Sequence, residues 1–130
     1  MGVKAVAFAS RALERGLDDL TMPQFRILTL LSSSPERASR IAELAAVSRP
    51  SLTGILDGLE AKGFIRRQDV EGDRRGVQLD VTPAGRKALA KAEKDAAASL
   101  GELLARLGAA DRRTALDGLA ALHTALVARP

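Results

Sequence analysis

The sequence predicts a mainly α-helical domain that carries one small β-hairpin. Aromatic residues make up only 2% of the chain and hydrophobic residues 46%, so Leu, Ile, Val and Ala must build the core, a composition that favours helices. Apolar residues recur at helical spacing through most of the chain, whereas residues 64–81 contain alternating, strand-like patterns. The length of 130 residues suits a single domain, which we expect to span residues 1–130.

The first two predicted helices lie before residue 32. Apolar and small residues recur every three or four positions from residue 3 to residue 17, which predicts the first helix. Thr21 is a suitable N-cap for the second helix, with Pro23 in the first turn, where its missing N–H costs little. The second helix is strongly apolar, so we expect it at the centre of the domain. The segment 32–35, Ser-Ser-Ser-Pro, ends it.

A short helix and a longer one follow, joined by a tight turn at residues 47–48. The inward stripe of the short helix consists of Ile41, Leu44 and Ala45. Ser48 can cap the longer helix, with Pro50 in its first turn, and Gly63 fits a left-handed C-terminal stop. The apolar residues of the longer helix share one face: Leu52, Ile55, Leu56 and Leu59. This arrangement predicts a helix-turn-helix.

Residues 64–70 and 77–81 are predicted to be the two strands of the hairpin. Val77, Leu79 and Val81 alternate with polar residues, which is the pattern of a half-buried strand. The connection 71–76 reads Glu-Gly-Asp-Arg-Arg-Gly, and its two glycines favour a hairpin. A basic hairpin therefore follows the helix-turn-helix directly.

Two more helices complete the chain. Thr82 and Pro83 form another cap and first-turn pair, and they begin a helix of about 25 residues, roughly 37 Å long. Gly108 breaks this helix, and Asp111 can cap the last one, whose apolar stripe is Leu116, Leu119, Leu122 and Leu126. A single small domain does not easily cover the stripes of the terminal helices, so we expect two copies to bury them. The alternative is that these helices fold back on their own core.

The composition restricts the classes of function. A net charge of +4 is compatible with nucleic-acid binding, but charges nearly balance between residues 48 and 76, so contact would depend on a few well-placed arginines. The chain has no cysteine and one histidine, which excludes disulfides and thiolate zinc sites and argues against a metal sensor. No apolar run is long enough to span a membrane and no secretion signal begins the chain, so we expect a cytoplasmic protein. We also expect no bound cofactor.

The helix that begins after Ser48 has small and polar residues on its exposed N-terminal face. Such a helix can enter the major groove of DNA, where the base edges present distinct donors and acceptors. Arg49 can make a forked contact to guanine, and Ser51 and Thr53 can donate to bases or phosphates. The alternative is that the serines only cap the helix and that Arg49 is a solvated surface residue.

The hairpin tip offers a second contact with DNA. An arginine at such a tip can enter the minor groove, where the negative potential is enhanced. Asp73 would hold an arginine or the turn amides in place and so fix the tip. The alternative is a solvated charged turn.

Five segments carry a resemblance to a known family: LTMPQF at 20–25, ELA at 43–45, LEAKG at 59–63, DRR at 73–75 and LDVTPAG at 79–85. Together they resemble the MarR family of bacterial transcription regulators. The resemblance implies a homodimeric winged helix-turn-helix regulator, expected to be a repressor, that binds an inverted repeat in double-stranded DNA. It implies a DNA-binding lobe at 21–83 and dimerisation helices at 1–20 and 84–130.

The resemblance also assigns positions on the DNA. The helix 48–62 is expected to read the major groove, and the wing tip 71–76 is expected to enter the minor groove through Arg75 or Arg74. The residues expected to contact or organise DNA are Ser48, Arg49, Pro50, Ser51, Thr53, Asp73, Arg74 and Arg75. Gly54 and Gly58, four apart on one helix face, stand where many members have basic residues. They would permit either closer approach to DNA or fewer phosphate contacts, and each costs about 1 kcal/mol of helix stability relative to Ala.

Many members of the family release DNA when a small aromatic or anionic effector binds between the dimerisation helices and the DNA-binding lobe. Residues that could line such a cleft are Phe8, Arg11, Leu13 and Phe25, although ordinary core is the simpler interpretation and the ligand-binding residues stay unassigned. The chain lacks a Gly-rich phosphate loop, and a nucleophile–histidine–acid set could form only around His123, so we predict that it is not an enzyme. The remaining alternative is a winged-helix module that binds protein, or a weak DNA binder.

Overall fold

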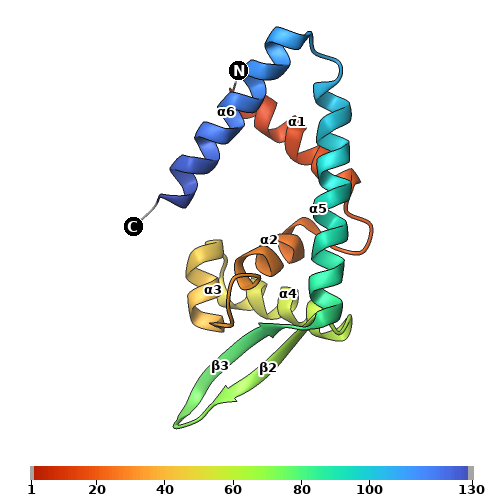
Figure 1. The fold of residues 1–130 in the computed structure, drawn as a ribbon. Helices are drawn as coiled ribbons and strands as arrows, with labels where there is room; N and C mark the ends of the chain where they lie inside the picture. The colour runs from red at the N-terminus through yellow and green to blue at the C-terminus, as the bar shows by residue number, and fades with distance from the viewer. Residues whose placement is uncertain (1, 129–130) are drawn as a thin grey trace.

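The computed structural model describes residues 2–128, except for the side chains of Arg75 and Val127. Its helices are α1 (Gly2–Arg15), α2 (Met22–Leu31), α3 (Ala38–Ala45), α4 (Arg49–Ala61), α5 (Pro83–Leu104) and α6 (Ala109–Val127). Its strands are β1 (Glu36–Arg37), β2 (Ile65–Val70) and β3 (Asp73–Val81). The long helix α5 joins two ends of the molecule, with α1 and α6 at one and α2 to α4 and the hairpin at the other (Figure 1). The mainly α fold with a small hairpin is confirmed.

Three helices begin with the same local device. The hydroxyl groups of Thr21, Ser48 and Thr82 accept hydrogen bonds from backbone N–H groups three residues later, at 3.3, 3.3 and 3.0 Å. A proline occupies the first turn of each helix. The caps expected for α2, α4 and α5 are therefore confirmed, because a side-chain acceptor satisfies an N–H that the helix leaves unpaired.

The expected cap of α6 is wrong. Gly108 has the extended backbone of an N-cap, and Asp111 lies inside the first turn. The helix starts before its first charged residue because the Gly108 carbonyl accepts its first hydrogen bond, from the Arg112 N–H at 2.9 Å. A carboxylate in the first turn still interacts favourably with the helix dipole.

The hairpin is part of a three-stranded antiparallel sheet, in the order β1-β3-β2. Strand β1 was not predicted, because its two residues are too few to show a periodic pattern. Strand β3 begins at Asp73 and not at residue 77, so only Glu71 and Gly72 form the turn. Gly72 has a left-handed φ of 79°, a conformation that glycine adopts without strain.

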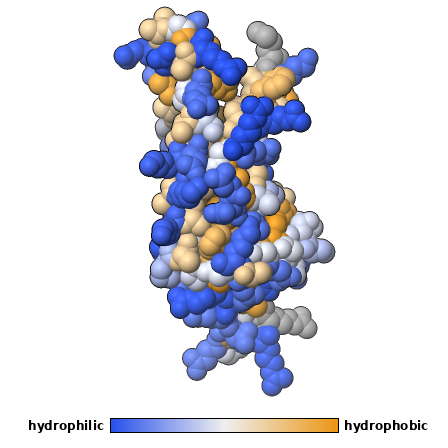
Figure 2. Space-filling model, turned by 90° about the vertical axis from the view of Figure 1, so that its right-hand side faces the viewer, coloured by the Kyte–Doolittle hydropathy of each residue, from blue (hydrophilic) through white to orange (hydrophobic). Residues whose placement is uncertain are grey.

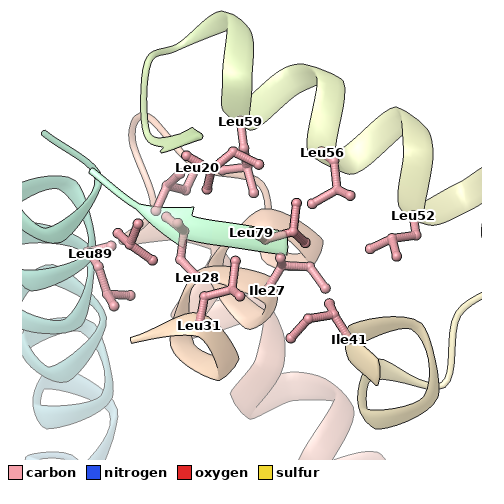
Figure 3. Close-up of a cluster of buried hydrophobic side chains, with 13 residues drawn as sticks. Leu20, Ile27, Leu28, Leu31, Ile41, Leu52, Leu56, Leu59, Leu79 and Leu89 are labelled. Carbon is pink, nitrogen blue, oxygen red and sulfur yellow. The ribbon is translucent and has the colours of Figure 1, made fainter. Parts of the chain in front are cut away.

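One hydrophobic core joins α2, α3, α4, the sheet and the start of α5 (Figure 3). Its fully buried side chains are Ile27, Leu28, Leu31, Ile41, Leu59 and Leu79. Helix α2 supplies three of them, which confirms its central position. Leu44 was expected to face inward, but it is 48% exposed. It projects from the flank of α3 because Ile41, Ala42 and Ala45 already share the inward face.

The other end of the molecule has little core of its own. Helix α1 packs along α5, yet it contains no buried residue. The leucines of α6 are 44% to 60% exposed, so α6 does not fold back on the core: Leu116, Leu119, Leu122 and Leu126. Apolar surface shows between hydrophilic side chains at this end (Figure 2). None of the helices described in residues 2–128 is long and apolar enough to span a membrane.

Candidate nucleic-acid interface

Helix α4, hereafter the recognition helix, separates its buried and exposed residues cleanly. Leu52, Leu56 and Leu59 are buried in the core. The predicted contact residues on its N-terminal half are all exposed: Ser48, Arg49, Pro50, Ser51 and Thr53. The core therefore orients the helix so that this polar face is exposed to solvent.

Three hydroxyl groups on this face already make local hydrogen bonds. Ser48 Oγ accepts from the Ser51 backbone N–H and donates to Ser51 Oγ at 2.9 Å. Thr53 Oγ1 donates to the carbonyl of Arg49 at 3.0 Å. Capping is thus a real function of Ser48. It leaves acceptor capacity on the hydroxyls, since each oxygen has two lone pairs.

The turn before the recognition helix depends on a left-handed residue. Ala46 ends α3 with φ 52° and ψ 42°, and its N–H donates to the carbonyls of Ala42 and Glu43. It is the one non-glycine residue with a positive φ among the residues described. The conformation redirects the chain within two residues, so the recognition helix can cross α3.

The wing, formed by β2, β3 and the turn between them, has a strong irregularity near its tip. Asp69 pairs with Val77, but the next residue, Val70, pairs with Asp73. One step on β2 therefore spans four on β3, and the segment 74–76 bulges. A Cβ on Gly76 would lie 2.8 Å from Asp73 Oδ2 and 2.9 Å from Val70 Cβ, so the bulge needs glycine there.

Asp73 ties the wing to the base of the sheet. Its Oδ2 accepts a hydrogen bond from Arg37 Nη1 of β1 at 3.3 Å. This carboxylate was expected to fix the tip, and one of its partners comes from a strand that the sequence did not reveal. Arg74 is exposed on the bulge. The side chain of Arg75, the preferred contact to the minor groove, lies outside the described residues.

A second arginine joins the wing to the recognition helix. Arg67 of β2 makes ion pairs with Asp57 through Nη2 and with Glu60 through Nε, the latter at 3.3 Å. Its side chain is 29% exposed. This link was not predicted from the sequence. The available signal was two carboxylates three residues apart on a helix, followed across a tight turn by a basic strand.

A cleft of about 420 Å³ opens between α3, the recognition helix and the wing. Three arginines line it, Arg37 of β1, Arg49 at the start of the recognition helix and Arg67 of β2, and Asp73 of the wing lines it as well. Thr53 also lines this cleft. The exposed half of the recognition helix and the wing thus border one hollow, lined by three arginines and one aspartate.

The two glycines of the recognition helix have different surroundings. Gly54 is exposed, and a Cβ there would meet nothing within 4 Å. Gly58 instead lies against the buried Gln24, so it does not belong to the same free face. The expectation that both glycines lie on the exposed face of the recognition helix is therefore wrong for Gly58, because the helix turns that position toward α2.

The residues considered for an effector cleft do not share one cavity. Phe8, which is 68% exposed, lines a shallow hollow with Arg11 on α1. Phe25 packs against the core and lines another hollow with Leu44. The interpretation as ordinary core therefore holds for Phe25 and is wrong for Phe8. Across the described part of the chain, no group of three or more His, Cys, Asp or Glu residues could hold a metal ion.

Comparison with known sequences gives consistent matches. The sequence model of the MarR family matches residues 20–77. The uncharacterised HTH-type transcriptional regulator YfiV of Bacillus subtilis is 33% identical over 109 residues, which cover 83% of this chain and 68% of YfiV. The HTH-type transcriptional repressor YetL of the same organism is 33% identical over 85 residues, which cover 63% of this chain and 47% of YetL.

Solved structures with similar folds include two complexes with small aromatic acids. The MarR family protein Rv2887 of Mycobacterium tuberculosis, in complex with salicylic acid, aligns with a TM-score of 0.71 and 28% identity, over 92% of this chain and 91% of its own. NadR, in complex with 4-hydroxyphenylacetate, aligns with a TM-score of 0.67 and 28% identity, over 92% of this chain and 87% of its own.

Proposed function

The chain belongs to the MarR family of transcriptional regulators, and from that premise we propose that it is a homodimeric repressor of an inverted-repeat operator. It is a DNA-binding regulator with a winged helix-turn-helix and not an enzyme. In this proposal the recognition helix, with its flanking residues from 48 to 62, enters the major groove. The wing enters the neighbouring minor groove. The protein would act in the cytoplasm, where bacterial DNA lies.

One observation carries the proposed mode of binding. The exposed half of the recognition helix and the wing border the same arginine-lined cleft, so both can meet one face of a duplex. The proposed contacts to bases and phosphates are Ser48, Arg49, Pro50, Ser51, Thr53, Arg74 and Arg75. Asp73, bonded to Arg37, would orient the wing and not contact DNA.

The exposed apolar side chains of the terminal helices support the proposed dimer. Val3 is 86% exposed, Val6 66% and Leu126 60%. Burying such side chains stabilises an assembly by roughly 25 cal/mol per Å², and a two-fold pair would cover both copies at once. We therefore assign residues 1–20 and 84–130 to dimerisation and residues 21–83 to DNA binding.

A small aromatic acid is the effector class best supported by similar structures. Salicylic acid and 4-hydroxyphenylacetate are bound in the complexes of Rv2887 and NadR. We propose that a compound of this class lowers the affinity of the present protein for its operator. Either acid should then raise the melting temperature of the free protein and release bound DNA. If both acids leave the melting temperature and DNA binding unchanged, this part of the proposal fails.

Genomic footprinting tests the main proposal. Bound fragments should share an inverted repeat whose half-sites lie about one helical turn apart, and the affinity should fall steeply as salt rises. A duplex with only one half-site is the control, because a dimer should bind it much more weakly. Equal affinity for both duplexes would contradict binding of an inverted repeat.

A further inference from the structure

The segment between α1 and α2 is held by two lysines that come from different parts of the molecule. We define residues 16–21 as the α1–α2 junction. Lys91 of α5 donates from Nζ to Asp18 Oδ2 at 3.1 Å. Lys62, the C-cap residue of the recognition helix, donates from Nζ to the carbonyl oxygen of Asp19. Asp18 is thus bonded to α5 and Asp19 to the recognition helix. These are the two helices whose relative orientation matters in a DNA-binding dimer.

On the side of α5, close packing and an ion pair act together. Gly16 is buried, and a Cβ there would lie 2.7 Å from the carbonyl oxygen of Asp95. Any larger residue would push the junction away from the α5 backbone. Lys91 also donates to Asp95 at 2.7 Å. Its bonds to Asp95 and then Asp18 raise its pKa above the ordinary range, so the ammonium is charged at neutral pH.

On the side of the recognition helix, Lys62 reaches two acceptors. Besides the carbonyl of Asp19, it donates to Gln24 Oε1 at 3.0 Å. The same oxygen accepts from the Thr21 backbone N–H at 3.1 Å, which closes the cap of α2. Gly58 lies against the Gln24 amide. The last turn of the recognition helix is therefore fixed to the start of α2 and to the junction.

We propose that Lys62 and Lys91 are positioning residues that fix the angle between the recognition helix and α5 and thereby set the half-site spacing that the dimer accepts. The inference rests on the proposed dimeric regulator. In a two-fold dimer built on α5, a rotation of each recognition helix changes the distance between the two helices. Half-sites one helical turn apart are about 34 Å apart, and one added base pair moves one half-site by about 3.4 Å and turns it by about a tenth of a turn. The affinity for each spacer therefore depends on the angle at which each recognition helix is held.

The simplest competing explanation is that Lys62 contacts a phosphate. Loss of a phosphate contact weakens binding to all sequences about equally and lowers the salt slope by about 1. Loss of a positioning contact changes the preference among spacings and leaves the slope unchanged. Lys91 separates the two explanations further. It lies eight residues beyond Pro83, about 12 Å along α5 from the wing, so the phosphate explanation does not extend to it.

The experiment measures affinity for a series of operators in which the spacer between half-sites changes in steps of one base pair. The starting operator is taken from footprinting of the wild-type protein. The variants are Lys62→Met and Lys91→Met, and Lys94→Met is the control, because it removes a lysine from the same helix as Lys91 without an ion pair seen among the described residues. Gln24→Glu is a conservative variant that keeps an oxygen for Lys62 and Thr21.

The wild type should prefer one spacer clearly over its neighbours. In Lys62→Met and Lys91→Met this preference should fall by about three- to tenfold, with unchanged salt slope and unchanged dimer. Lys94→Met and Gln24→Glu should keep the wild-type profile. Equal weakening at every spacer, or no change, would overturn the positioning role while the wild type still supports the proposed function. If the wild type itself prefers no inverted repeat, the proposed function fails first and the inference fails with it.

Discussion

A Cβ atom on Gly58 of the recognition helix would lie 2.7 Å from Nε2 of Gln24 in α2. Gln24 is 8% exposed, and its Oε1 accepts hydrogen bonds from the Thr21 N–H and from Lys62. The glycine thus makes room for an amide that caps one helix and holds the end of another. Gly58 has a packing role, whereas Gly54 faces open space.

Replacing each glycine with alanine should separate these two roles. Gly54→Ala should raise the free energy of unfolding by about 1 kcal/mol, because alanine is the better helix former and nothing obstructs it. Gly58→Ala should be less stable than Gly54→Ala by about 1 kcal/mol, because the amide of Gln24 must move and weaken its bonds. Urea denaturation measures both. Equal stabilisation by the two substitutions would show that the Gln24 amide moves aside without any loss in the free energy of unfolding.

Glycine at position 46 should stabilise the fold. The left-handed conformation costs an L-residue roughly 1–2 kcal/mol, and Ala46 adopts it at φ 52°. Glycine avoids this cost but loses about 0.5–1 kcal/mol through the greater freedom of the unfolded chain. Ala46→Gly should therefore gain about 0.5–1 kcal/mol in thermal or urea unfolding. A clear loss of stability would mean that the Ala46 side chain makes packing contacts that outweigh the strain.

Arg67→Met should weaken operator binding by about tenfold. The substitution leaves the carboxylates of Asp57 and Glu60 without their arginine, and uncompensated negative charge beside DNA phosphates is repulsive. Adding Asp57→Asn should recover at least about threefold of the loss, as a double-mutant cycle measured by gel shift would show. No recovery would indicate that Arg67 acts by contacting DNA or by holding the wing, and not by neutralising Asp57.

Arg75→Ala should weaken operator binding at least about tenfold while the dimer persists, because a minor-groove contact and its charge are lost. Arg106→Ala removes the same charge near the far end of α5 and is the matched control. Fluorescence anisotropy with the footprinted operator gives both affinities. Unchanged affinity of Arg75→Ala would rule out this residue as the wing contact and direct attention to Arg74.

Leu119→Asp should convert the dimer to a monomer. Leu119 is 44% exposed on the leucine stripe of α6, and a buried carboxylate without a partner would cost several kcal/mol at an interface. The particle mass measured by light scattering should fall from twice 13.7 kDa in the wild type to 13.7 kDa in the variant. Asp117→Ala, on the opposite face of α6, should leave the mass unchanged. A wild-type particle of 13.7 kDa at micromolar concentration would contradict the dimer.

Much of the local structure could be predicted because its causes lie within a few residues. Thr21, Ser48 and Thr82 each satisfy an N–H three positions later, and the apolar stripe of the recognition helix repeats with the helical period. The cap of α2 carried a further readable signal, since Thr21 and Gln24 form a Thr-x-x-Gln capping box. Its consequence for Lys62, 38 residues away from Gln24, had no local sign.

The sequence by itself determined the order of the helices and of the β2–β3 hairpin, the caps of α2, α4 and α5, and the family, because short-range hydrogen bonding and periodicity specify them. Only the tertiary structure decided which faces are covered. It turned Leu44 outward and Gly58 toward α2, added β1 to the sheet, and placed Arg37 beside Asp73, 36 residues away. Such contacts depend on how whole elements pack, so neither residue of a pair reveals its partner in the linear chain.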